Sequence, residues 1–92
     1  MRARKVDANL SDIVNTARAL GFLVYVRNDE FGDLDLQFAG KHYVVEVKRP
    51  KGGRYTEGQK RLRAEGWVIL TMCTVEEVVA FRATLFAGKQ SQ

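Results

Sequence analysis

The sequence predicts a single α/β domain with a four-stranded mixed sheet, flanking helices and a C-terminal helix. Three observations lead to this fold class. The chain has 92 residues, the size of one small domain. Hydrophobic residues make up 46% of it, as in ordinary globular proteins. The periodicity of the apolar residues changes along the chain in the order helix, three strands, helix, strand, helix.

The pattern begins with an amphipathic helix. After a basic N-terminal arm over residues 1–8, apolar residues recur at intervals of three and four between Leu10 and Leu20, as on one face of a helix. Gly21 suits the position just after a helix end. The apolar run 22–26 that follows is typical of a short strand.

Two further strands are expected to form a hairpin. Apolar and polar residues alternate over residues 33–38, as in a strand with one buried face. The next strand should run from about His42 to Lys48, because Pro50 cannot donate a hydrogen bond to a sheet. The turn between the two strands is expected near Gly40-Lys41.

The second half alternates helix and strand signals. A capping-box pattern that starts at Thr56 predicts a short helix that ends at Gly66. Residues 67–70 are apolar throughout, as in a strand covered on both faces. A last helix is expected between Thr74 and a tail at residues 88–92. Short links make the first three strands antiparallel, and the helical crossover should lay the fourth parallel to the third.

The net charge of +4 is concentrated in one segment. Residues 48–63 hold seven of the fifteen basic residues and one acid, which leaves eight basic and ten acidic groups elsewhere. A localised positive segment is typical of a protein that binds a phosphate backbone, although a solvated basic face has the same composition. The candidate DNA contacts in this segment are Arg49, Lys51, Arg54 and Lys60.

Composition also bears on location. No apolar stretch approaches the length of a membrane span, and the first residues do not have the pattern of a signal peptide. The single cysteine excludes an internal disulfide and fits a reducing compartment. We therefore expect a cytoplasmic protein without a membrane partner.

Charged residues interrupt both hairpin strands. Glu46 and Lys48 lie two positions apart and therefore share a face, as do Asp33 and Asp35. With the turn near Gly40-Lys41, Asp35 should pair with Glu46 or with a residue beside it. Carboxylates about 5 Å apart repel unless a cation lies between them, and such oxygen ligands suit Mg²⁺ or Mn²⁺. A lysine beside the ion can orient or deprotonate a water, whereas Glu-x-Lys alone also fits a surface ion pair.

This ordered set of residues resembles a known nuclease superfamily. Asp35 followed by Glu46-Val47-Lys48 resembles the PD-(D/E)xK nucleases, and the chain more closely resembles their small stand-alone VRR-NUC type from phages and bacteria. The resemblance covers about residues 4–84, although Leu34 stands where the family usually has proline. The matching positions are Val6-Asp7-Ala8-Asn9, Ile13-Val14, Gly21, Gly32, Asp35-Leu36, Gly40, Glu46-Val47-Lys48, Thr56, Gln59, Gly66 and Val75-Glu76-Glu77.

The resemblance implies a restriction-endonuclease-like αβββαβ core and a metal-dependent DNA endonuclease. The catalytic residues that it implies are Asp35, Glu46, Lys48 and Gln59. Asp35, Glu46 and the backbone carbonyl of Val47 would hold Mg²⁺ or Mn²⁺, and Lys48 would act on the water nucleophile. Asp33 is an extra acid on the same face, either a supporting ligand or a competitor for the role of Asp35. Gln59 also fits a purely structural role as a capping residue.

Relatives of this size often act as homodimers on branched DNA, including four-way Holliday junctions. The resemblance therefore implies a homodimeric, structure-selective enzyme in a bacterial or phage-infected cell. Two other functions stay open. One is a non-catalytic nucleic-acid-binding module on the same fold, and the other is a subunit of a phage DNA-processing complex. Trp67 is expected to serve in core or interface packing rather than in base stacking.

Overall fold

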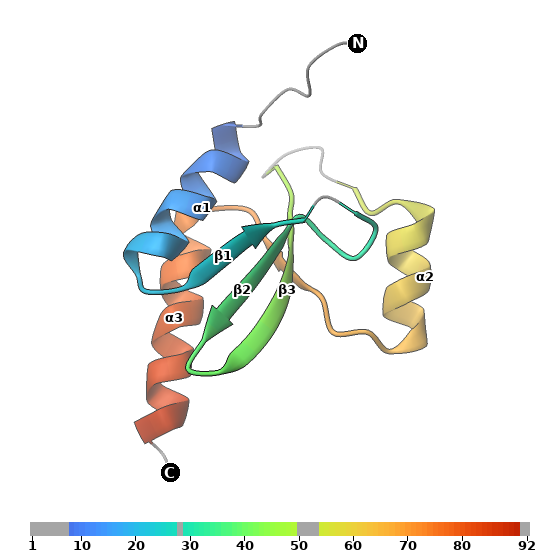
Figure 1. Cartoon of the computed structure of the whole chain (residues 1–92). Coiled ribbons are helices and arrows are strands. Elements are labelled where there is room, and N and C mark those ends of the chain that lie inside the picture. Colours follow the sequence, from blue (N-terminus) through green and yellow to red (C-terminus); the bar gives the residue numbers. More distant parts are fainter. Residues whose placement is uncertain (1–7, 28, 50–53, 91–92) are drawn as a thin grey trace.

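The computed structural model describes residues 8–27, 29–49 and 54–90 (Figure 1). Helices and strands alternate in the predicted order, which confirms the α/β fold class. The elements are α1 (Ala8–Ala19), β1 (Leu23–Val26), β2 (Leu34–Phe38), β3 (Lys41–Val47), α2 (Glu57–Glu65), β4 (Leu70–Met72) and α3 (Val75–Gln90).

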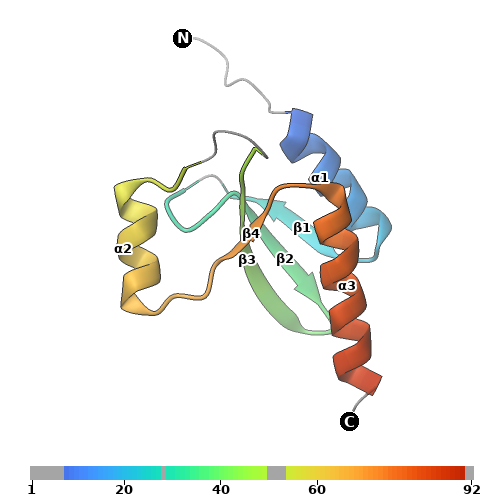
Figure 2. The ribbon, with the colours of Figure 1, turned by 180° about the vertical axis from the view of Figure 1, so that it is seen from behind.

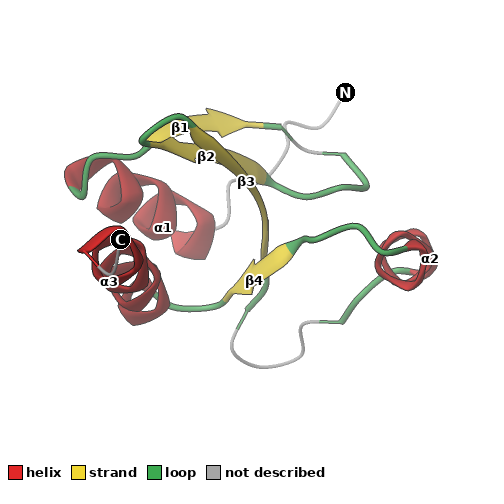
Figure 3. Ribbon diagram, turned by 90° about the horizontal axis from the view of Figure 1, so that it is seen from below, coloured by secondary structure: helices red, strands yellow, loops and turns green. Residues whose placement is uncertain are grey.

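The strands form one four-stranded sheet in the order β1-β2-β3-β4. Both contacts of β2 are antiparallel, and β4 pairs with β3 in parallel, as the short links and the helical crossover predict. Helices α1 and α3 lie side by side on one face of the twisted sheet (Figures 1 and 2). Helix α2 lies on the other side, next to the connection into β4 (Figure 3).

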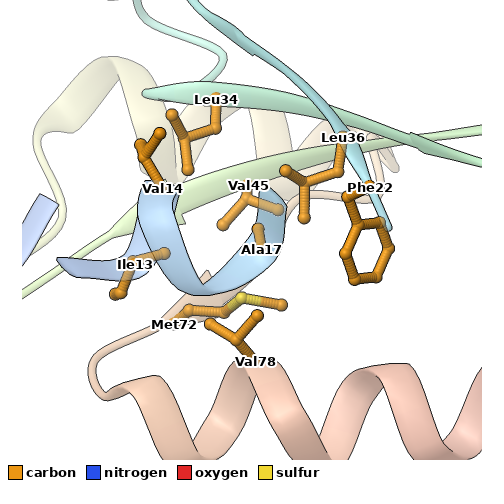
Figure 4. Packing of buried hydrophobic residues seen from close by; sticks show 9 residues of the cluster. All are labelled: Ile13, Val14, Ala17, Phe22, Leu34, Leu36, Val45, Met72 and Val78. Carbon is orange, nitrogen blue, oxygen red and sulfur yellow. The ribbon is translucent and has the colours of Figure 1, made fainter. Parts of the chain in front are cut away.

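The hydrophobic core fills the space between the sheet and the helices α1 and α3 (Figure 4). The alternation in β2 directs Leu34 and Leu36 into this core, where both are fully buried. The polar residues between and before them therefore face the opposite side of the sheet. The other members of the core cluster are Ile13, Val14, Ala17, Phe22, Val45, Met72 and Val78.

The hairpin turn lies one residue earlier than the sequence predicts. Phe38 pairs with Lys41, so the turn residues are Ala39 and Gly40, with φ angles of 53° and 80°. Two central residues with positive φ are the mark of a type I′ turn, which matches the twist of a hairpin. Alanine rarely adopts this conformation, so the sequence alone does not predict a turn at this position. A turn one residue earlier moves every cross-strand partner by two positions.

A fourth strand is present, but its predicted bounds, residues 67–70, are wrong. β4 spans Leu70–Met72, and the residues before it connect α2 to the sheet. Trp67 and Val68 are 54% and 78% exposed, so they do not belong to a strand covered on both faces. The Trp67 ring instead meets the Phe31 ring edge to face, with 5.0 Å between their centroids. An apolar run alone does not distinguish a strand from a connection that packs on a loop.

The boundaries of the first and last helices also differ from the prediction. Helix α1 already includes Ala8 and Asn9, and residues 1–7 of the predicted arm lie outside the described residues. Thr74 caps α3 as predicted, because its hydroxyl accepts a hydrogen bond from the Glu77 amide at 3.3 Å. Helix α3 then continues through Gly88 to Gln90, where a tail is predicted. A single glycine weakens a helix but does not end it.

Among the described residues, no helix is both long enough and apolar enough to cross a membrane.

Candidate active site

The candidate site lies where β1 and β3 end and β2 begins, on the side of the sheet away from α1 and α3 (Figure 1). The Asp33 amide donates a hydrogen bond to the Val45 carbonyl at 2.9 Å, and Asp33 Oδ2 accepts one from the Val47 amide at 2.8 Å. These two bonds fix the Asp33 carboxylate beside Glu46. Gly32 permits this approach, because a Cβ atom there would lie 2.7 Å from the Val45 carbonyl oxygen.

Glu46 is a charged residue placed where water barely reaches it. The residue is 5% exposed, and its Oε2 lies 3.2 Å from Lys48 Nζ. Its other oxygen, Oε1, is buried and has no hydrogen-bond partner among the described residues. Burial raises the pKa of Glu46 above its ordinary value, the charge of Asp33 raises the pKa further, and the Lys48 ammonium lowers it.

Lys48 is held by three acceptors. Its ammonium donates to the Arg54 carbonyl at 2.5 Å and to Gln59 Oε1 at 3.1 Å, in addition to the contact with Glu46. An ammonium has three protons, so each is directed at one acceptor. The Asn9 side chain donates to the Lys48 carbonyl at 3.0 Å and so ties α1 to the end of β3. Asn9 therefore lies beside the site as a helical residue rather than as a cap.

Gln59 combines the two roles that the sequence left open. In the capping box, the Gln59 backbone amide donates to Thr56 Oγ1 at 3.1 Å, and the Gln59 side-chain Oε1 accepts from the Thr56 backbone amide at 2.9 Å. The same Oε1 accepts a hydrogen bond from Lys48. Gln59 is 8% exposed. Its capping bonds therefore fix the orientation of the oxygen that holds the ammonium.

The structure does not bring Asp35 to this cluster. Asp35 pairs with Val44 rather than with Glu46 or a direct neighbour of Glu46, so the predicted pairing is wrong. Its Oδ1 lies 2.6 Å from Arg27 Nη1 and 3.7 Å from His42 Nε2. The physical reason is the earlier turn, which moves the cross-strand partner by two positions. The residue beside Glu46 is therefore Asp33, the competitor that the sequence analysis kept open.

The donor set around Glu46 fits a divalent cation. Two carboxylates lie side by side, Glu46 has a buried oxygen without a hydrogen-bond partner among the described residues, and the charge of Asp33 raises the cost of charging Glu46. A hard cation bound to oxygen ligands removes both costs. Among the described residues, no three His, Cys, Asp or Glu side chains gather into a metal site. The protein would therefore supply few ligands, and water or phosphate oxygens would complete the shell, as is common for Mg²⁺.

The predicted DNA contacts are only partly placed. Arg49 and Arg54 are exposed, and Arg54 lies beside the site because its carbonyl holds Lys48. Lys60 is exposed on α2 and pairs with Glu57 at 3.5 Å. Lys51 lies outside the described residues. The basic segment therefore begins at the site and continues along α2.

Sequence reasoning missed two residues that support the site. Arg27 donates to Asp35 and to both oxygens of Asp29, and the two carboxylates raise its pKa. The Tyr55 ring centre lies 5.3 Å from Lys48 Nζ. The Arg27–Asp35 and Lys48–Tyr55 contacts join different parts of the fold, so the periodicity of a single element could not have revealed them.

Comparisons with protein-family models, with curated proteins and with solved structures found no match for this chain. The resemblance to the VRR-NUC type therefore stays a sequence-based prediction. A functional assignment has to rest on the fold and on the geometry of the site.

Proposed function

We propose that this protein is a metal-dependent endonuclease that hydrolyses phosphodiester bonds in DNA. The observation that carries the proposal is the buried Glu46 carboxylate, which has one oxygen on Lys48, one oxygen without a partner, and Asp33 as its neighbour. Burying an acid of this kind costs stability. This cost favours a functional role for Glu46. Carboxylates and a lysine that converge in this way are the groups needed for metal-assisted hydrolysis.

The chain's own residues divide the work. Asp33 and Glu46, with the backbone carbonyl of Val47, would hold Mg²⁺ or Mn²⁺, so Asp33 takes the role that the resemblance implied for Asp35. When bound, the ion stabilises the negative charge that develops on the phosphate. Lys48 holds the water nucleophile through a proton on Nζ. Its 3.2 Å contact with Glu46 is the longest of its three contacts, and it is the one that a water between them would replace.

The basic segment supports DNA as the substrate. Arg54 lies at the site, and α2 exposes Lys60 and Arg61, each of which also pairs with a glutamate. Charges in this position hold a phosphate backbone across the site. Action on branched DNA as a homodimer is part of the proposal, because the resemblance to the VRR-NUC type implies it. Edge strand β1 also exposes Leu23 and Tyr25, which leaves apolar surface for a second copy.

The test is a cleavage panel with purified protein. Linear, nicked, flapped and four-way DNA would be incubated with Mg²⁺ or Mn²⁺, and cut positions read on denaturing gels, with Glu46→Ala as the blank. Cleavage that depends on metal and on Glu46 is expected, with branched substrates cut faster than linear ones. Binding without cleavage of any substrate by the wild type would instead favour a nucleic-acid-binding module. Sedimentation velocity would test the homodimer.

A further inference from the structure

We propose that Tyr55 is a positioning residue that holds the Lys48 ammonium against Glu46 and Gln59. The proposal concerns the geometry of Lys48 in the protein without metal, and its catalytic consequence rests on the proposed function. It assigns a role to the contacts of Tyr55 with α2 and β4. The active-site chemistry alone does not require these contacts.

Two consecutive residues contact the same ammonium. The Arg54 carbonyl accepts a hydrogen bond from Lys48 Nζ at 2.5 Å, and the centre of the Tyr55 ring lies 5.3 Å from the same atom. A cation within about 6 Å of an aromatic ring is attracted to the ring face. The ring also covers a side of the ammonium that water would otherwise reach. Lys48 therefore depends on this short stretch of chain for its orientation.

The Tyr55 ring is itself anchored to the rest of the fold. Its hydroxyl lies 2.6 Å from the Thr71 hydroxyl on β4. The Arg63 guanidinium of α2 lies 4.4 Å from the ring centre. Arg63 is fixed in turn, because it donates to the Ile69 carbonyl at 2.8 Å and to Thr71 Oγ1 at 3.0 Å. The ring thus has a position defined by β4 and α2, although Tyr55 is 37% exposed.

These contacts give the lysine a fixed place. A lysine side chain has many rotamers, and ordering it costs conformational entropy. The carbonyl, the Gln59 amide and the ring restrict Nζ to one region, next to Oε2 of Glu46. Without the ring, the ammonium keeps its hydrogen-bond acceptors but gains a path to solvent. A misplaced lysine would slow the chemical step more than it would weaken DNA binding.

The first experiment measures the geometry without any activity. A ring close to a methylene group shifts its NMR signals upfield, so the ε-CH₂ signals of Lys48 should be shifted in the metal-free wild type. The shift should persist in Tyr55→Phe, which keeps the ring, and disappear in Tyr55→Leu. Tyr25→Leu, at an exposed tyrosine of β1, is the matched control and should leave the shift in place. Unshifted Lys48 signals in the wild type, or a shift retained in Tyr55→Leu, would overturn the proposal.

The second experiment measures single-turnover cleavage by the same variants. Tyr55→Leu should lower the rate constant about three- to tenfold at saturating enzyme, with half-saturation changed less than twofold. Tyr55→Phe removes only the hydroxyl anchor, and Thr71→Val also removes the acceptor of one Arg63 hydrogen bond. Both variants should stay within about twofold of wild type. A change in half-saturation alone would make Tyr55 a DNA contact and refute its positioning role. If the wild type does not cleave while the NMR shifts behave as expected, the proposed function fails and the positioning stands.

Discussion

Two aspartates only two residues apart, Asp33 just before β2 and Asp35 within it, lie in opposite environments. Asp33 accepts a hydrogen bond from the Val47 amide and adds its charge to the buried Glu46. Asp35 is paired directly with Arg27 at 2.6 Å and lies across from Val44. The same residue type therefore contributes to an uncompensated cluster in one place and to a compensated ion pair in the other.

The difference lies in where the excess negative charge is placed. Around Asp35, the second carboxylate that shares Arg27 is Asp29, whose side chain is 50% exposed to water. Around Asp33, the second carboxylate is Glu46, which is buried and contacts a single lysine, Lys48. Water solvates the excess negative charge at Asp29. The excess negative charge at Asp33 and Glu46 would be compensated by a bound cation. The hairpin register, rather than the sequence spacing, decides which aspartate lies beside Glu46.

The largest expected effect separates the two aspartates by activity. Asp33→Asn should lower the single-turnover cleavage rate by more than about 100-fold, because it removes a ligand from a site with few ligands. Asp35→Asn should lower the rate by less than about tenfold. Thermal unfolding of both variants checks that the fold is intact. Equal loss in the two variants would contradict the separation, and activity retained only in Asp33→Asn would return the role to Asp35.

The second prediction breaks the compensated pair. Arg27→Met should destabilise the protein by about 1–3 kcal/mol, because it leaves the largely covered Asp35 carboxylate without its cation. Much of this loss should be recovered in Arg27→Met/Asp35→Asn. Urea unfolding at pH 7 measures both values as a double-mutant cycle. Strictly additive changes would show that Arg27 and Asp35 do not depend on each other.

The third prediction concerns the uncompensated cluster. Burial raises the pKa of Glu46, so the folded protein keeps a proton that the unfolded chain releases near the ordinary glutamate value of 4.5. The metal-free fold therefore loses stability as the pH rises from that value through the raised pKa of Glu46. Glu46→Gln removes this loss and should be more stable than wild type by roughly 1 kcal/mol at pH 7, and the difference should vanish at low pH.

Chemical unfolding at several pH values measures this difference. Saturating Mg²⁺ or Mn²⁺ should stabilise the wild type and leave Glu46→Gln almost unchanged, because only the folded wild type binds the ion. A Glu46→Gln variant that is less stable than wild type at pH 7 without metal would show that the carboxylate is a net stabilising group. Such a result would remove the main argument for a metal at this position.

The sequence predicted much of the fold but not the register on which the site depends. Helix caps such as Thr56 and Thr74 and the alternation in β2 are local signals, and they placed their elements correctly. Spacing along the chain predicted that Glu46 and Lys48 share a face, whereas the resemblance implied the place of Gln59 beside them. The pairing of β2 with β3 is not local, because it depends on a turn whose first central residue is an alanine. Tertiary partners such as Arg63 for Tyr55 leave no pattern at all.

The smallest expected effect tests the turn that sets this register. Ala39 has a φ of 53°, which asparagine adopts more readily than alanine, so Ala39→Asn should stabilise the hairpin by about 0.5–1 kcal/mol. Asn-Gly favours the type I′ turn already present, and therefore the pairing of Phe38 with Lys41 should persist. Cross-strand NOEs and urea unfolding measure the register and the stability. The matched variant Gly40→Ala, at a φ of 80° with open space around it, should destabilise through the backbone alone. NOEs for a turn one residue later in Ala39→Asn would contradict the expected persistence of the register. Cleavage retained in that shifted register would mean that the turn does not dictate which aspartate serves the site.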